Sequence, residues 1–279
     1  MKRNFTLTIL IFIFFKIPLS IAKESLTLNY ENIDLTLKGN FIQGGLVIGK
    51  TNLNSIIIFK NKKIRQTPDG FFVIGFGRDH PENASLSLEI NKKLITKSFK
   101  IKQRIYKIQK INGIQKKMVT PPKSFYERII RENKTIKEVR NLDSNLDFVF
   151  QKFNWPTQGV ISGVFGSQRI LNGKTKRPHY GIDIAAKKGT TVVAPTESIV
   201  RMAKKDLYYT GGTIMLDHGH GVTSVYSHLS SINVKVGDKV LKNQKIGEVG
   251  STGRSTGPHL DWRVNWFDQR LDPLLLLEN

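Results

Sequence analysis

Five histidine and aspartate side chains in the second half of the chain are of the types that bind metal ions and carry protons. They are His179, Asp183, His228, His259 and Asp261. The chain of 279 residues contains no cysteine, which excludes a thiolate zinc site and a cysteine nucleophile. Any metal ion here would therefore be held by imidazole and carboxylate groups. Each residue alone is more often structural, but the five together favour metal-assisted or acid–base chemistry.

The local sequence predicts the elements that position these side chains. Polar and apolar residues alternate from His259 onward, and residues two apart on a strand share a face. His259, Asp261 and Arg263 are therefore expected to point one way. The opposite face is expected in a core and contains Leu260, Trp262, Val264 and Trp266. His179 lies four residues before Asp183, but the intervening Gly181 favours a loop that enters a strand over a helix.

Four segments in this region form a specific pattern. They are RPHYGIDIA (177–185), LDHGHG (216–221), YSHLS (226–230) and GRSTGPHL (253–260). In this order and spacing, they resemble the lysostaphin-type (LytM-domain) zinc metallopeptidases, which cut peptidoglycan peptides. The resemblance covers about residues 155–275. It implies a mainly β fold with an antiparallel β metallopeptidase domain, and hydrolysis of stem peptides or peptide cross-links of bacterial peptidoglycan.

The resemblance also implies a role for each of the five residues. Position by position, His179, Asp183 and Asp261 correspond to the ligands of one zinc ion per chain, and His228 and His259 to catalytic residues. The family has histidine where this chain has Asp261, although aspartate is also a zinc ligand. Two aspartates and one neutral histidine give Zn²⁺ a formally neutral shell, from which we expect weaker Lewis acidity and higher activity at alkaline pH. Alternatively, the site is adapted to Asp261 through a partner that histidine would leave unpaired.

Two further histidines, His218 and His220, match no ligand position of the family. They lie in a glycine-rich stretch, and we expect them on a turn or at the rim of a groove.

The N-terminal segment 1–22 has the pattern of a secretion signal. Lys2 and Arg3 precede a short apolar run, and Ser20-Ile21-Ala22 is typical of a cleavage site. The run is too short for a transmembrane helix, so we expect cleavage and location in the periplasm or cell envelope. The alternative is an uncleaved N-terminal anchor.

The rest of the chain predicts three segments. Residues 23–118 contain short strand patterns between glycine, proline and asparagine, which indicates an N-terminal β-sandwich-like domain. The pair Asp79-His80 within it is expected on a solvated turn. Residues 119–154 have helical spacing of apolar side chains and predict a helical linker to the metallopeptidase domain, residues 155–279.

The chain is strongly basic, with 44 lysine and arginine residues against 22 acidic ones and a net charge of +22. Such a charge attracts anionic cell-envelope polymers or a membrane surface, but a lysine-rich composition explains it as well. Because no nucleic-acid-binding motif accompanies the charge, no nucleic-acid partner is expected.

Three other functions remain open. The first is a non-catalytic protein of the same fold that binds and activates another cell-wall hydrolase or a division protein. The second is a lipoyl-type carrier, suggested by the hairpin pattern of residues 234–250, which lacks a convincing lysine turn for modification. The third is a polyanion-binding module, which depends on charge alone.

Overall fold

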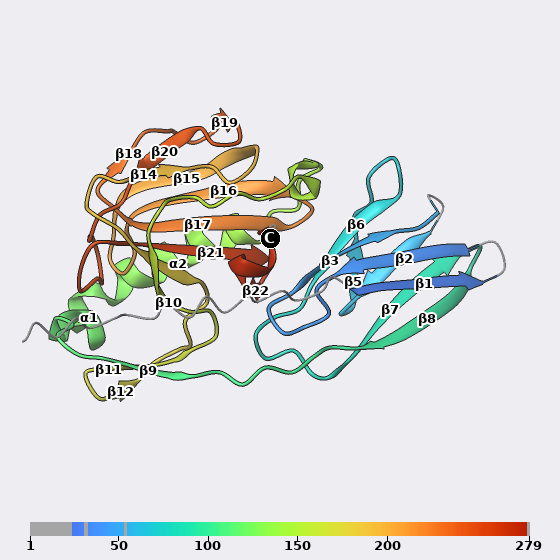
Figure 1. Ribbon diagram of the computed structural model, residues 1–279, viewed down its shortest axis with the longest axis horizontal. Helices are drawn as coiled ribbons and strands as arrows, with labels where there is room; N and C mark the ends of the chain where they lie inside the picture. Colours follow the sequence, from blue (N-terminus) through green and yellow to red (C-terminus); the bar gives the residue numbers. More distant parts are fainter. Residues whose placement is uncertain (1–23, 31–32, 53–54, 278–279) are drawn as a thin grey trace, which may run out of the picture.

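Figure 1 shows the computed structural model of the chain, in which residues 24–30, 33–52 and 55–277 are described. Strands make up most of the regular structure, so the predicted mainly β fold is confirmed. The expected signal segment lies outside the described residues. Within the described residues, no helix has the length and apolarity needed to cross a membrane.

Two four-stranded antiparallel sheets form the N-terminal part of the structure, in the orders β1-β2-β3-β6 and β5-β4-β7-β8. Their strands are β1 (Glu24–Tyr30), β2 (Ile33–Gly39), β3 (Leu46–Lys50), β4 (Ile56–Phe59), β5 (Lys62–Ile64), β6 (Phe71–Gly75), β7 (Asn83–Ile90) and β8 (Lys93–Lys100). Alternate residues are buried, such as Leu35 and Leu37 in β2 and Leu86 and Leu88 in β7. The two-residue period of a strand places them on the inner faces, so that the sheets share one apolar core.

His80 does not lie on a solvated turn, so this expectation was wrong. Its side chain is buried, stacked on Phe59 at 6.3 Å between ring centres and edge-on to Phe76 at 5.2 Å. Asp79, the other residue of the pair, is exposed as expected. The turn folds back onto the apolar core, which the polar local sequence does not reveal.

A connector follows the sandwich and runs along the second half of the chain. Its elements are β9 (Ile108–Ile111), α1 (Lys116–Val119), η1 (Lys123–Phe125), α2 (Tyr126–Arg140) and η2 (Phe148–Phe150). Strand β9 pairs in parallel with a strand of the C-terminal part, so this segment joins a sheet there. The helix is shorter than its apolar spacing predicts. Beyond Arg140, Ser144 and Asp147 bond to Asp217 and His220 instead of continuing the helix.

An eight-stranded antiparallel sheet forms the centre of the C-terminal part, in the order β10-β13-β21-β17-β16-β15-β19 with β22 beside β21. Its strands are β10 (Val160–Gly163), β13 (Ile182–Ala185), β15 (Ser198–Leu207), β16 (Gly211–Gly219), β17 (Val222–Leu229), β19 (Lys239–Val240), β21 (His259–Trp266) and β22 (Gln269–Leu271). Two three-stranded sheets flank it and contain β11 (Gln168–Leu171), β12 (Lys174–Thr175) and β9 in one, and β14 (Thr191–Val193), β18 (Ser231–Ile232) and β20 (Lys245–Glu248) in the other. The short helix η3 (Pro273–Leu275) follows.

The two faces of β21 differ as the sequence alternation predicts. Leu260, Trp262 and Val264 are fully buried in the apolar core. The opposite face carries the polar residues and is partly covered by α2, whose Ile136 and Val139 pack on a cluster that includes Val225. Because Val225 is the cross-strand partner of Arg263, α2 lies over the same face as the candidate site.

The two parts of the molecule are in direct contact. The rings of Phe59 and Trp266 lie 5.8 Å apart across the junction. Arg104 forms a 2.8 Å ion pair with the buried Asp272, so the N-terminal part contacts both the end of β21 and the chain that follows β22.

Candidate metal centre

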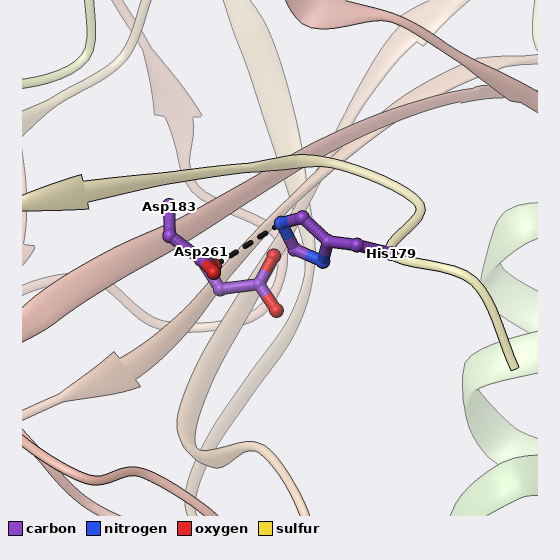
Figure 2. A group of neighbouring side chains, drawn as sticks. All are labelled: His179, Asp183 and Asp261. Atoms are coloured by element: carbon purple, nitrogen blue, oxygen red, sulfur yellow. Dashed lines mark ion pairs between the residues drawn. The ribbon is translucent and has the colours of Figure 1, made fainter. Parts of the chain in front are cut away.

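Three of the predicted residues converge at the edge of two neighbouring strands (Figure 2). Asp183 in β13 and Asp261 in β21 are direct cross-strand partners. His179, in the loop before β13, points its ring toward both carboxylates, and its Nε2 lies 3.2 Å from Asp183 Oδ1. One ligand-type atom from each residue lies within 4.8 Å of the others. The structure thus brings together the residues that the family resemblance implies as metal ligands.

Close backbone packing holds Asp183 in this position. Strand β10 passes so near that a Cβ at Gly163 would lie 2.3 Å from Asp183 Oδ2. On the other side, a Cβ at Gly181 would lie 2.4 Å from the backbone oxygen of Trp262. A side chain at either position would collide with these atoms, so close packing around Asp183 requires glycine at 163 and 181.

The three residues are buried, yet several of their polar atoms have no hydrogen bond. His179 and Asp261 are each 1% exposed. Neither ring nitrogen of His179 nor Oδ1 of Asp183 has a hydrogen-bond partner. A buried polar atom without a partner costs about 1–3 kcal/mol, and a metal ion between these atoms would remove that cost. The donor set, one imidazole and two carboxylates, therefore fits a zinc ion.

Two arginines pair with the carboxylates, which the sequence analysis missed. Arg169 of β11 donates to Asp183 Oδ2. Arg263 forms an ion pair with Asp261, and its Nε lies 2.9 and 3.1 Å from the two carboxylate oxygens. Burial raises the pKa of Asp261, but Arg263 outweighs burial and holds that pKa well below its usual range. Each carboxylate oxygen has two lone pairs, so these ion pairs leave room for a metal ligand bond.

These ion pairs change the charge count of the site. Two carboxylates and two guanidiniums sum to zero, so a Zn²⁺ ion would add two positive charges. When only the three ligands are counted, the net charge of the site with Zn²⁺ bound is zero. The arginines therefore weaken the argument for low Lewis acidity and for an alkaline optimum. They also identify Arg263 as the partner that a histidine at position 261 would leave unpaired.

His228 and His259 lie side by side next to these three residues, with ring centres 4.8 Å apart. His228 Nδ1 is 2.7 Å from the backbone oxygen of Thr252, and His259 Nδ1 is 2.8 Å from that of Gly257. A carbonyl oxygen only accepts, so these contacts place a proton on Nδ1 of both rings. In the neutral form of either ring, Nε2 is then the nitrogen without a proton, and that of His259 lies 3.8 Å from Asp183 Oδ1.

His228 is held in a constrained state. Its φ of 66° lies in the left-handed region, which is uncommon for a residue other than glycine. A 2.8 Å hydrogen bond from its backbone N–H to Thr210 stabilises this conformation. Burial lowers the pKa of His228 to about 4, so its ring is neutral at pH 7. Backbone strain of this kind is frequent at functional sites.

His218 and His220 have a structural role: His220 lies on a turn, as expected, whereas His218 lies in a strand and neither residue lies at the rim of a groove. Both are buried. His218 lies within β16 with Nε2 2.7 Å from Ser224 Oγ, and His220 Nε2 lies at hydrogen-bond distance, 3.1 Å, from Asp147 Oδ1 of the connector. We call Asp217, His218 and His220 the connector cluster, because their partners come largely from residues 144–153.

Comparison with known proteins agrees with this geometry. Residues 177–273 match the model of Peptidase family M23. The peptidoglycan DD-endopeptidase ShyA of Vibrio cholerae is 39% identical over 45% of this chain and 29% of that protein. The cell division protein DipM of Caulobacter vibrioides is 29% identical over 57% of this chain and 26% of that protein.

A solved structure extends the similarity to both parts of the molecule. It is a candidate M23 peptidase from Pseudomonas aeruginosa, 25% identical, with a TM-score of 0.67 over 85% of this chain and 94% of that chain. The chain spans only 26–32% of the length of the first curated relatives it matches. The family match encloses His179, Asp183, His228, His259 and Asp261. Residues 177–273 therefore form a peptidase M23 (LytM-type) domain.

Proposed function

We propose that this protein is a zinc-dependent endopeptidase that hydrolyses stem peptides or peptide cross-links of bacterial peptidoglycan in the periplasm or cell envelope. The observation that carries the proposal is the group of buried ligand-type atoms on His179 and Asp183, which lie close to one another, form no hydrogen bond, and face two imidazoles with free Nε2 atoms. Similarity to a protein named peptidoglycan DD-endopeptidase supports the substrate class.

His179, Asp183 and Asp261 would hold one zinc ion per chain. When bound, such an ion activates a water molecule and polarises the carbonyl of the bond to be cut. Arg263 fixes the orientation of Asp261, and Arg169 fixes that of Asp183. Held in this way, the carboxylates do not have to reorganise when a cation enters.

The two imidazoles have different tasks in this proposal. His228 is buried and neutral, so its Nε2 accepts a hydrogen bond and orients the attacking water. The His259 side chain is 16% exposed and can exchange protons with solvent. We therefore assign to His259 Nε2 the uptake of a proton from the attacking water and its transfer to the leaving amine. Both rings are aligned by backbone carbonyls, which keeps Nε2 directed away from those carbonyls.

A second function is favoured by one specific observation. Each carboxylate of the site already has a guanidinium partner, so the charges balance without a metal ion. A domain of this kind can remain folded when empty and bind another cell-wall hydrolase, whose activity it would regulate. The similarity to a protein named as a cell division protein is compatible with that role.

Digestion of peptidoglycan separates the two functions. Purified protein is incubated with sacculi, with and without a chelator, and the soluble products are identified by mass. The hydrolase predicts peptide products that disappear with the chelator, return with added zinc, and are absent for Asp183→Asn. Asp69→Asn, in an exposed turn, is the matched control and should act like wild type. If sacculi stay intact at every zinc concentration, the hydrolase proposal is wrong.

A further inference from the structure

A pocket of about 360 Å³ lies at the junction of the sandwich and the M23 domain. The sandwich contributes Lys60 and the turn that contains Arg78. The M23 domain contributes Arg177, Tyr180 and Arg270. Tyr180 follows His179 directly in the chain, so the pocket begins one residue from a candidate metal ligand.

The basic residues of this pocket exceed its acidic residues, Asp79 and Asp268. Arg78 is already paired with Asp79 and donates to the backbone oxygen of Gly166 at 2.7 Å. Within the part of the chain that the structure describes, neither Arg177 nor Arg270 forms an ion pair with a carboxylate. The pocket therefore contains two guanidiniums without an anionic partner.

The surroundings of Arg270 increase this excess of positive charge. Its guanidinium lies 5.5 Å from the centre of the Tyr180 ring and donates to the side chain of Asn265. Arg140, at the end of α2, adds a further positive charge near Arg270, and its buried Nε has no hydrogen-bond partner. Burial, followed by the positive charges of Arg140 and Arg263, lowers the pKa of Arg270 to about 9, so it remains charged at neutral pH. A bound anion would relieve this repulsion.

We propose that the junction pocket binds a free carboxylate of the peptide substrate, an inference that rests on the proposed peptidase function. A guanidinium presents parallel N–H donors that match the two oxygens of a carboxylate. The position beside Tyr180 would place this carboxylate near the bond that is cut. The pocket thus selects peptides with a free carboxylate, and it gives the sandwich a part in substrate recognition through Lys60 and Arg78.

Paired peptides test this inference. The probes are the acetylated tripeptide L-lysyl-D-alanyl-D-alanine and its C-terminal carboxamide, and binding is measured by calorimetry with zinc-loaded protein. A charge-assisted pair predicts roughly 10-fold or more tighter binding of the acid than of the amide. Arg177→Gln should reduce this preference for the acid to about twofold or less. Arg177→Lys should retain part of the preference, because lysine keeps the positive charge but lacks the paired N–H donors of a guanidinium. Metal content should not change in either variant.

Arg131→Gln is the matched control, because Arg131 is an exposed arginine of α2 that does not line the pocket. Equal binding of acid and amide by wild type overturns the inference. So does inorganic phosphate that competes more strongly than acetate, since the pocket would then prefer phosphate. Binding of the acid that depends on Arg177, in a protein that leaves sacculi intact, would support the pocket and reject the hydrolase.

Discussion

Two groups of buried histidines and aspartates lie in the same M23 domain and differ in how their polar atoms are used. In the candidate metal site, formed by His179, Asp183 and Asp261, both nitrogens of His179 lack a hydrogen bond. In the connector cluster, His218 contacts Ser224 and the backbone of Glu197, and Asp217 accepts from Ser144 and pairs with Arg201. Apart from Nδ1 of His220, that cluster is satisfied by the protein itself.

This difference shows why residue type alone does not identify a site. Both groups contain histidine, aspartate and a nearby arginine. The connector cluster uses its atoms to fasten residues 144–153 to the sheet, where Phe153 packs 5.0 Å from the ring of His218. The candidate metal site retains polar atoms for which the fold supplies no hydrogen bond. Unused hydrogen-bonding capacity in a buried site is therefore the more informative signal.

The largest expected effect concerns the two imidazoles beside the metal site. His228→Ala and His259→Ala should each lower kcat/KM on purified peptidoglycan peptides by roughly 10²–10⁴-fold, the usual size of acid–base contributions. Metal content should stay at the wild-type level in both. His218→Gln, from the connector cluster, should change kcat/KM by less than about threefold, because His218 lies outside the candidate site and takes no part in acid–base chemistry. If both alanine variants keep wild-type rates, the assignment of the two histidines is wrong.

Asp261→His tests whether the site is adapted to aspartate. The substitution restores the ligand type of the family but leaves the Arg263 guanidinium without its carboxylate. We expect a loss of roughly 1–3 kcal/mol in the free energy of unfolding and weaker zinc binding. The double variant Asp261→His, Arg263→Gln should recover part of the stability, as measured by urea unfolding. A single variant that binds zinc and unfolds like wild type would show that Arg263 does not constrain this position.

The connector cluster should make stability depend on pH. Burial lowers the pKa of His218 to about 4 from its ordinary value of 6.5. Between these values the unfolded chain binds more protons, so the contribution to stability is complete above pH 6.5 and is lost as the pH falls toward 4. From pH 7.5 to pH 5, His218 should account for a loss of about 2 kcal/mol. Urea unfolding of His218→Gln should show a smaller loss over this range, although His228 titrates in the same direction. An unchanged pH dependence would contradict a buried neutral His218.

The sequence predicted those features that depend on local pattern. Alternation along β21 placed His259 and Asp261 on one face and Trp262 in the core, because a strand repeats every two residues. The motif order brought His179 and Asp183 into the same site. The helix of the connector was predicted from its apolar spacing, although the structure ends it at Arg140.

Features that depend on contacts distant in sequence could not be predicted. Arg169 reaches Asp183 from another sheet, and β9 pairs with β11 about 60 residues later (Figure 1). The burial of His80 and His218 depends on aromatic rings from other segments. Arg263 was placed on the correct face, but its pairing with Asp261 requires rotamers that a sequence pattern does not specify.

Metal occupancy tests the central claim most directly. Protein is loaded with zinc, dialysed to remove the excess, and measured by native mass spectrometry. Wild type and the connector-cluster variant His220→Ala should each contain one zinc ion per chain. The double variant His179→Ala, Asp183→Ala should give none, because it removes the open donor atoms while leaving the connector cluster intact. Wild-type protein that binds no zinc, or a double variant that binds as much as wild type, would contradict the claim that these open atoms form a metal site.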